Sequence, residues 1–122
     1  MPWKFDLKSP VSQQVSDRLR LEILQGTYGP GQQFPTVRSL AYEASVNPNT
    51  VQKALTTLEE EGLLINHGTV GRFVTEDEAL IGMRRRELQI QFLDRIAREA
   101  EFLGITREDL TRYLIEREER SL

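Results

Sequence analysis

The sequence contains no cysteine and only one histidine, His67, among its 122 residues. The missing cysteines exclude disulfides, thiolate metal ligands and cysteine nucleophiles. A single histidine without partner ligands at suitable spacing argues against a metal site. The sequence also has no histidine and carboxylate cluster and no phosphate-cradling glycine loop. We therefore expect no enzymatic activity, no metal and no cofactor.

Long apolar runs are absent as well. The N-terminal residues 1–6 lack the apolar core of a secretory signal, and no stretch of about 18 apolar residues could span a bilayer. We expect a soluble, cytoplasmic protein with no membrane partner. Trp3 and Phe5 are expected to pack on the rest of the fold or on a second chain, and ligand stacking is the alternative.

The net charge of -3 is distributed unevenly along the sequence. Residues 1–75 carry seven basic and seven acidic groups, whereas residues 76–122 carry nine basic and twelve acidic groups. The negative excess therefore lies outside the N-terminal part. This weakens the objection that an acidic chain would avoid nucleic acid, because affinity for DNA comes largely from basic groups that neutralise phosphates.

Apolar spacing predicts a first helix over residues 11–25. Val11, Val15, Leu19 and Ile23 recur every four residues and so share one helix face. Ser9 is expected to cap this helix, with Pro10 as its first residue. Gly26 is expected to end it.

Two further helices and a hairpin are predicted before residue 75. A short helix follows Thr36 as N-cap and runs to about residue 44, and another runs from about residue 47 to 61. Residues 63–65 and 72–75 read as two strands joined by a glycine-containing turn. Three helices followed by a hairpin are typical of a winged helix.

The second and third helices also satisfy the demands of a helix-turn-helix. Small and apolar residues occur where the two helices must cross and where the second must be buried, namely Leu40, Ala41, Ala44, Val46, Val51 and Ala54. Ser45 stands at the turn position that often carries glycine to permit a positive φ. The sequence departs from the usual pattern only at this position.

Motifs at four ordered places resemble the GntR family of bacterial transcription regulators. They are Phe34-Pro35-Thr36-Val37-Arg38-Ser39-Leu40-Ala41, Val46-Asn47-Pro48-Asn49-Thr50-Val51-Gln52-Lys53-Ala54, Leu58-Glu59-Glu60-Glu61-Gly62-Leu63-Leu64 and Gly71-Arg72-Phe73-Val74. The similarity covers about residues 9–75. It implies a winged helix-turn-helix that binds double-stranded DNA and regulates transcription.

The resemblance also implies which residues contact DNA. The arginine that follows the Pro-Thr pair in the family corresponds to Arg38, and the family's major-groove residues at the start of the third helix fall on Asn47, Asn49, Thr50 and Gln52. Lys53 is a phosphate candidate from its own chemistry. Asn and Gln can pair with adenine edges, and Arg can bind guanine or phosphate.

The chain departs from the family pattern in two places. Pro48 stands where many relatives carry an arginine, which should shift base preference, and Asn-Pro-Asn resembles the YtrA subgroup. The wing lacks the basic residues that often precede its tip in relatives. His67, Thr69 and Arg72 are its candidates for minor-groove or phosphate contacts.

Residues 76–122 are expected to form two dimerisation helices, because their length matches the short YtrA-like arrangement. Their apolar stripe consists of Ile81, Leu88, Phe92, Ile96, Leu103, Leu110 and Leu114. Gly104 should separate the helices, and Thr106 with Asp109 should cap the second. The runs Glu59–Glu61 and Arg84–Arg86 are interpreted as a solvated helix end and as surface salt-bridge partners.

The fold class expected from sequence is mainly α with a small β-hairpin. It comprises a winged helix-turn-helix DNA-binding domain over residues 1–75 and a helical dimerisation region over residues 76–122. The expected function is a sequence-specific repressor that acts as a homodimer on a pseudo-palindromic operator. A winged-helix module that binds protein instead of DNA is the alternative. A small-molecule effector is left open as a further partner.

Overall fold

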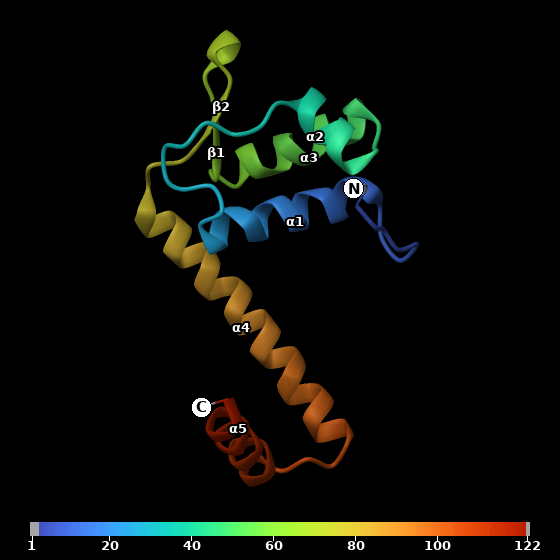
Figure 1. Cartoon of the computed structure of the whole chain (residues 1–122), viewed down its shortest axis with the longest axis vertical. Coiled ribbons are helices and arrows are strands. Elements are labelled where there is room, and N and C mark those ends of the chain that lie inside the picture. The colour runs from blue at the N-terminus through green and yellow to red at the C-terminus, as the bar shows by residue number, and fades with distance from the viewer. Residues whose placement is uncertain (1–2, 122) are drawn as a thin grey trace. The chain divides into compact units, whose positions relative to one another are not determined.

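The computed structural model describes residues 3–121, which are mainly helical and include one two-stranded hairpin (Figure 1). The elements are α1 (Val11–Gln25), α2 (Val37–Ala44), α3 (Pro48–Glu60), β1 (Leu64–Asn66), the 3-10 turn η1 (Gly68–Val70), β2 (Arg72–Val74), α4 (Glu78–Phe102) and α5 (Arg107–Ser121). The expected order of elements is confirmed.

The chain forms two compact units, one that extends through Arg85 and one that begins at Arg86. This division lies inside α4 and later than residue 75, because the first turns of α4 pack on the N-terminal unit. Ile81 is only 5% exposed there and belongs to the main hydrophobic core. The functional boundary after residue 75 stays a prediction.

The core of the N-terminal unit lies mainly between α1 and α3. The apolar stripe of α1 is buried at Val15, Leu19 and Ile23, while Val11 at its start is 36% exposed. From α3, Leu55 and Leu58 are completely buried. Removing one such side chain from water contributes roughly 1.5–3 kcal/mol, so this packing fixes the orientation of α3.

The start of α1 differs from the expectation by one residue. Pro10 is the N-cap, with an extended ψ of 143°, and its carbonyl accepts hydrogen bonds from the N–H groups of Gln13 and Gln14. Ser9 therefore lies before the cap. Gly26 ends the helix as expected, in the left-handed conformation with φ 86°.

A side-chain cap begins each helix of the helix-turn-helix. The Thr36 hydroxyl accepts the N–H of Ser39 at 3.1 Å and begins α2. The Asn47 side-chain oxygen accepts the N–H of Asn49 at 2.8 Å and begins α3. Between them Ser45 is left-handed, with φ 57° and ψ 47°. Serine thus adopts the conformation for which glycine is usual.

Replacing Ser45 with glycine should stabilise the fold. A left-handed conformation costs a residue with a Cβ about 1–2 kcal/mol, and glycine avoids this cost. Glycine also has more conformational freedom in the unfolded chain, which offsets part of the gain in stability. We expect Ser45→Gly to raise the free energy of unfolding by about 0.5–1 kcal/mol in urea denaturation. Glu43→Gly, in the right-handed helix nearby, should lower it by a similar amount. A destabilised Ser45→Gly variant would contradict this account.

The hairpin is extended by a segment of the loop between α1 and α2. In the hairpin itself, Leu64 pairs with Val74 and Asn66 with Arg72 in antiparallel register. On the other edge of β2, the N–H of Phe34 donates to the Arg72 carbonyl at 2.7 Å and the N–H of Gly31 to the Val74 carbonyl at 2.9 Å. The loop therefore supports the base of the hairpin like a third strand.

The beginning of α4 is fastened to α1, which corrects two expectations. Ile81 was expected to serve dimerisation, but its burial in the core accounts for it within one chain. Arg85 was expected to form a surface salt bridge, yet its Nε donates to the Leu24 carbonyl at 2.7 Å, at the end of α1. Arg84 also donates to a backbone carbonyl, that of Glu61, at 3.4 Å.

The second unit contains the rest of α4, a turn and α5. Gly104, with φ 72°, ends α4, and the N–H of Ile105 returns to the Ala100 carbonyl at 2.8 Å. Both features agree with the expected helix stop. Thr106 and Asp109 form the expected reciprocal cap, since each accepts the backbone N–H of the other. Within residues 3–121 no helix is long and apolar enough to cross a membrane.

The cap of α5 should give this helix a dependence on pH. The hydrogen bonds from Thr106 hold the pKa of Asp109 below its usual value of 3.8. A lowered pKa means that the contribution of the carboxylate to the cap is present above pH 3.8 and is lost as pH falls through the folded-state pKa. We expect Asp109→Ala to speed amide exchange in α5 at pH 7, and the difference from the parent chain to be smaller at pH 2. An equal difference at both pH values would contradict this role.

Candidate nucleic-acid interface

The first two turns of α3 present a polar surface. Asn49, Gln52 and Lys53 are exposed, as is the cap residue Asn47, while Thr50 is half-buried. The opposite side of the same helix is fixed by core residues such as Val51 and Leu55. The predicted groove residues therefore lie together at the start of one rigid helix. The Asn47 oxygen is already used in the cap, which leaves its amide group as a donor.

Two basic side chains, one on α2 and one on α3, have no partner among the residues that the structure describes. Arg38, in the first turn of α2, is exposed, and so is Lys53 in α3. Neither side chain forms a hydrogen bond or ion pair with the residues that the structure describes. An exposed cation that stabilises nothing within the fold is available for a phosphate or a guanine edge.

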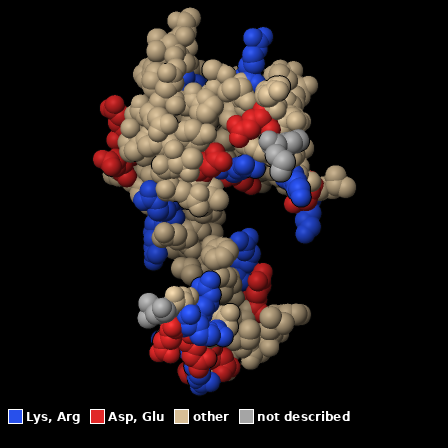
Figure 2. Space-filling model, in the orientation of Figure 1, with Lys and Arg blue, Asp and Glu red and all other residues tan. Residues whose placement is uncertain are grey.

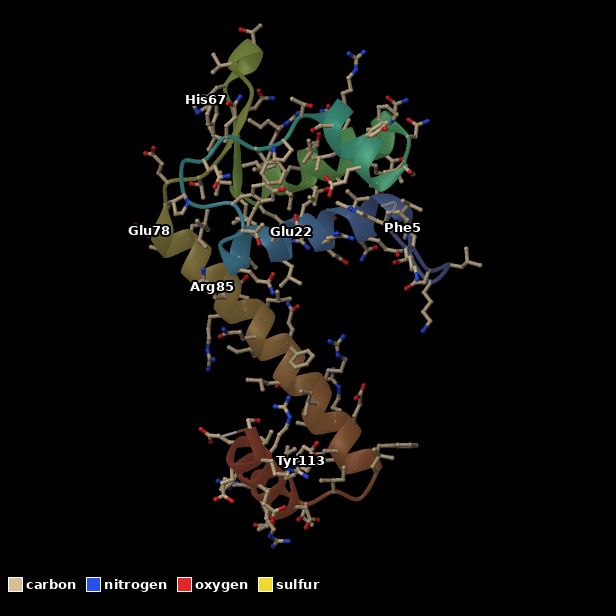
Figure 3. All side chains as sticks on the ribbon, in the orientation of Figure 1. Phe5, Glu22, His67, Glu78, Arg85 and Tyr113 are labelled. Carbon is tan, nitrogen blue, oxygen red and sulfur yellow. The ribbon has the colours of Figure 1, made fainter. Side chains whose placement is uncertain are left out.

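The wing keeps two of its three predicted contact residues exposed. His67, labelled on the hairpin in Figure 3, and Thr69 in η1 are both exposed, and the His67 ring lies 5.2 Å from that of Phe73. Arg72 differs, since its side chain is 16% exposed and its Nε is hydrogen-bonded to Glu59. The guanidinium thus ties β2 to the end of α3, and a DNA contact of Arg72 stays a prediction.

The acidic run at the end of α3 is largely paired, not simply solvated as expected. Glu61 receives two hydrogen bonds from Arg20 on α1, at 2.7 and 2.6 Å, and Glu59 pairs with Arg72. The bond to Glu61 is the largest cause of a raised pKa for Arg20, followed by desolvation, which opposes it. These pairs neutralise carboxylates at the end of α3. Sequence spacing could not reveal them, because the partners are far apart in the chain.

The N-terminal segment packs on the first unit, as one of the expectations for Trp3 and Phe5 stated. Trp3 is 8% exposed and belongs to the core, and the Arg18 guanidinium carbon lies 3.9 Å from the centre of its ring. Phe5 is half-buried against the same core. The buried Trp3 ring thus fastens this segment to α1.

Charges of both signs are interspersed on the visible face of the first unit, which shows no broad basic patch (Figure 2). This face of the unit therefore offers no extended basic surface to a phosphate backbone.

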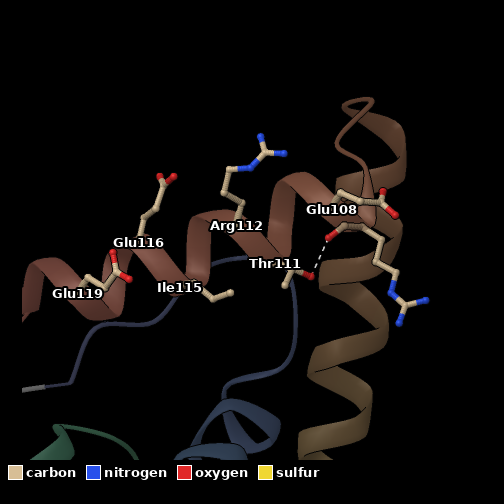
Figure 4. Close-up of a pocket in the computed structure, with 7 residues that line it drawn as sticks. Glu108, Thr111, Arg112, Ile115, Glu116 and Glu119 are labelled. Atoms are coloured by element: carbon tan, nitrogen blue, oxygen red, sulfur yellow. Dashed lines mark hydrogen bonds between the residues drawn. The ribbon is translucent and has the colours of Figure 1, made fainter.

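Other possible sites are less developed. A hollow along α5 is lined by Arg107, Glu108, Thr111, Arg112, Ile115, Glu116 and Glu119 (Figure 4). All of these residues come from one helix, so the hollow lacks a second wall to enclose a small molecule. Residues 3–121 contain no cluster of His, Asp or Glu suited to a metal ion.

A helix-turn-helix with a polar, exposed second helix and a hairpin wing defines a winged-helix DNA-binding regulator. Residues 11–74 match the family of bacterial regulatory proteins called the gntR family. The chain belongs to this GntR family and is a helix-turn-helix transcriptional regulator. The resemblance inferred from the four motifs is confirmed.

Relatives extend the similarity beyond the DNA-binding unit. The transcriptional repressor YtrA of Bacillus subtilis is 29% identical over 88% of this chain and 84% of its own length. A GntR family transcriptional regulator from Listeria monocytogenes has a TM-score of 0.85 at 30% identity and covers 92% of this chain and 98% of its own. The AraR DNA-binding domain in complex with an operator has a TM-score of 0.56 at 29% identity, covering 62% and 95%.

Proposed function

We propose that this regulator is a repressor that binds a pseudo-palindromic operator as a homodimer. In this arrangement the α3 helices of two chains enter successive major grooves, with half-sites about one helical turn, or ~34 Å, apart. Repression follows because the bound dimer blocks polymerase. The observation that carries the proposal is the exposed polar start of α3, together with Arg38 and Lys53, which have no partner among the described residues.

The contacts divide into two kinds. Asn49, Thr50 and Gln52 are assigned to base edges, with the free amide of Asn47 beside them. Arg38 and Lys53 are assigned to phosphates, and Arg38 also suits guanine. His67 and Thr69 on the wing are assigned to the minor groove or its phosphates.

Support for the homodimer comes from the apolar side chains that the second unit leaves exposed. Exposed fractions are 37% for Leu88, 51% for Phe92, 71% for Leu103 and 53% for Leu114. Soluble chains rarely expose so many large apolar side chains on neighbouring helices unless another surface covers them. A second copy of this chain covers the face with the same residues, as a two-fold interface requires.

Salt dependence of DNA binding tests this proposal against a winged helix that binds protein. Each phosphate that a cation neutralises contributes about -0.9 to the slope of log K against log salt. With Arg38 and Lys53 from both chains, the slope should be about -4. We expect this value in fluorescence titrations with a duplex that contains the operator. A slope near zero, or no binding by the folded protein, would favour the protein-binding module.

A further inference from the structure

The side chain of Gln33 connects the loop before α2 to the tip of the wing. Its Nε2 donates to the Val70 carbonyl at 3.0 Å, across 37 positions of sequence. Val70 is the last residue of η1, and Thr69 directly precedes it. Gln33 also faces Phe73 of β2 through an isolated bridge. One residue therefore touches both the base and the tip of the hairpin.

The wing has a glycine, Gly71, where the Gln33 side chain approaches it. A Cβ on Gly71 would lie 2.9 Å from the Gln33 Nε2, and Gly71 has a φ of 117° that favours glycine. A side chain at this position would crowd the Gln33 amide group in its present place. Beyond this contact, the hydrogen bonds that the tip makes with other described residues are local, such as that from the His67 N–H to the Gly71 carbonyl at 2.9 Å.

We infer that Gln33 is a positioning residue that sets the wing against the DNA next to each half-site. This inference rests on the proposed function, because it concerns where Thr69 and His67 meet the duplex. The hydrogen bond is exposed to solvent, so it contributes little to the stability of the domain. Its effect is on the orientation of a tip whose other hydrogen bonds, among residues 3–121, are local. Gln33 itself needs no contact with DNA.

The same loop supplies a matched control. Gln32, the neighbouring residue, accepts the N–H of Gly29 at 2.9 Å through its side-chain oxygen. Gln33→Met and Gln32→Met each replace a neutral side chain with one of similar length and remove one exposed hydrogen bond. Only the first substitution removes a bond to the wing.

The experiment uses the full chain and the duplex it selects from random sequence. Affinity and minor-groove footprinting by hydroxyl radicals are measured for the parent and both variants, with thermal unfolding alongside. We expect Gln33→Met to lower the affinity for DNA by about three- to tenfold, which is what the loss of one hydrogen bond typically causes. The variant should also lose protection of the minor groove beside the half-sites. The major-groove preferences should persist, and Gln32→Met should match the parent.

The outcomes separate this inference from the proposed function. If the parent protein selects no sequence, the proposed function fails, whatever Gln33 does. If the parent selects an operator but its wing protects no flanking minor groove, the inference is overturned. It is also overturned if Gln33→Met protects the flank as the parent does, or if both methionine variants lose affinity equally.

Discussion

Replacing Phe92 with aspartate is expected to convert the proposed dimer to a monomer and to weaken operator binding at least about 100-fold. Phe92 is 51% exposed on α4 in the second unit, outside the core of the DNA-binding unit. A charge at this position would have to be desolvated in the dimer. The monomer then loses the gain from two linked half-site contacts, which typically amounts to 10²–10⁴.

Gln91→Asp is the matched control, since it adds the same charge to the neighbouring exposed position of α4. Sedimentation should show a monomer for Phe92→Asp and a dimer for Gln91→Asp, and both should unfold like the parent. If Phe92→Asp remained a dimer, the assignment of this face to dimerisation would be wrong. A monomer that kept full operator affinity would show that DNA binding does not need two chains.

Arg38→Ala should weaken operator binding by about 1–3 kcal/mol per half-site and leave the fold unchanged. Arg38 is exposed and makes no hydrogen bond or ion pair among the described residues, so its removal disturbs no contact within the domain. Isothermal or fluorescence titration measures the loss of affinity, and circular dichroism confirms the fold. An affinity equal to that of the parent would reject the DNA contact.

Two companion variants identify the kind of contact that Arg38 makes. Arg38→Lys keeps the charge, so it should retain most of the affinity if the partner is a phosphate and lose it if a guanine is bound by the planar fork. Arg112→Ala removes the same charge from an exposed position of α5, where the side chain is 67% exposed. It should bind the operator like the parent.

Local sequence signals predicted the helices and the helix-turn-helix because their determinants lie within a few residues. The Thr36 cap, the left-handed turn at Ser45 and the Thr106 and Asp109 cap each depend on neighbours in the chain. Apolar periodicity likewise identified the face of α1 that is buried. The shift of its N-cap to Pro10 is an error of one residue at an element boundary.

Contacts between distant residues could not be read from the sequence. Arg72 suits a phosphate by its chemistry and place in the wing, but Glu59 binds it in the folded domain. Ile81 shares the apolar period of α4, yet the period does not say which surface covers each residue. The spacing of apolar residues predicts which face of a helix is buried. The surface that packs against that face is determined by the tertiary fold.

For the candidate interface, the sequence predicted the contact residues. The structure adds which of their side chains already form hydrogen bonds or ion pairs within the chain. Arg38 and Lys53 remain unpaired among the described residues, while the Asn47 oxygen is used by its cap. Gln33 carried no signal of its own, because its role depends on a wing that lies far along the chain. The DNA contacts of Arg38, Lys53 and Asn47 stay predictions.

Selection of bound fragments from random duplex DNA, at a stated salt concentration and with the mass of the complex recorded, tests the central claim most directly. The account predicts an inverted repeat with half-sites about one helical turn apart, bound by two chains. Failure of the folded protein to enrich any sequence, or enrichment of a single half-site bound by one chain, would contradict it.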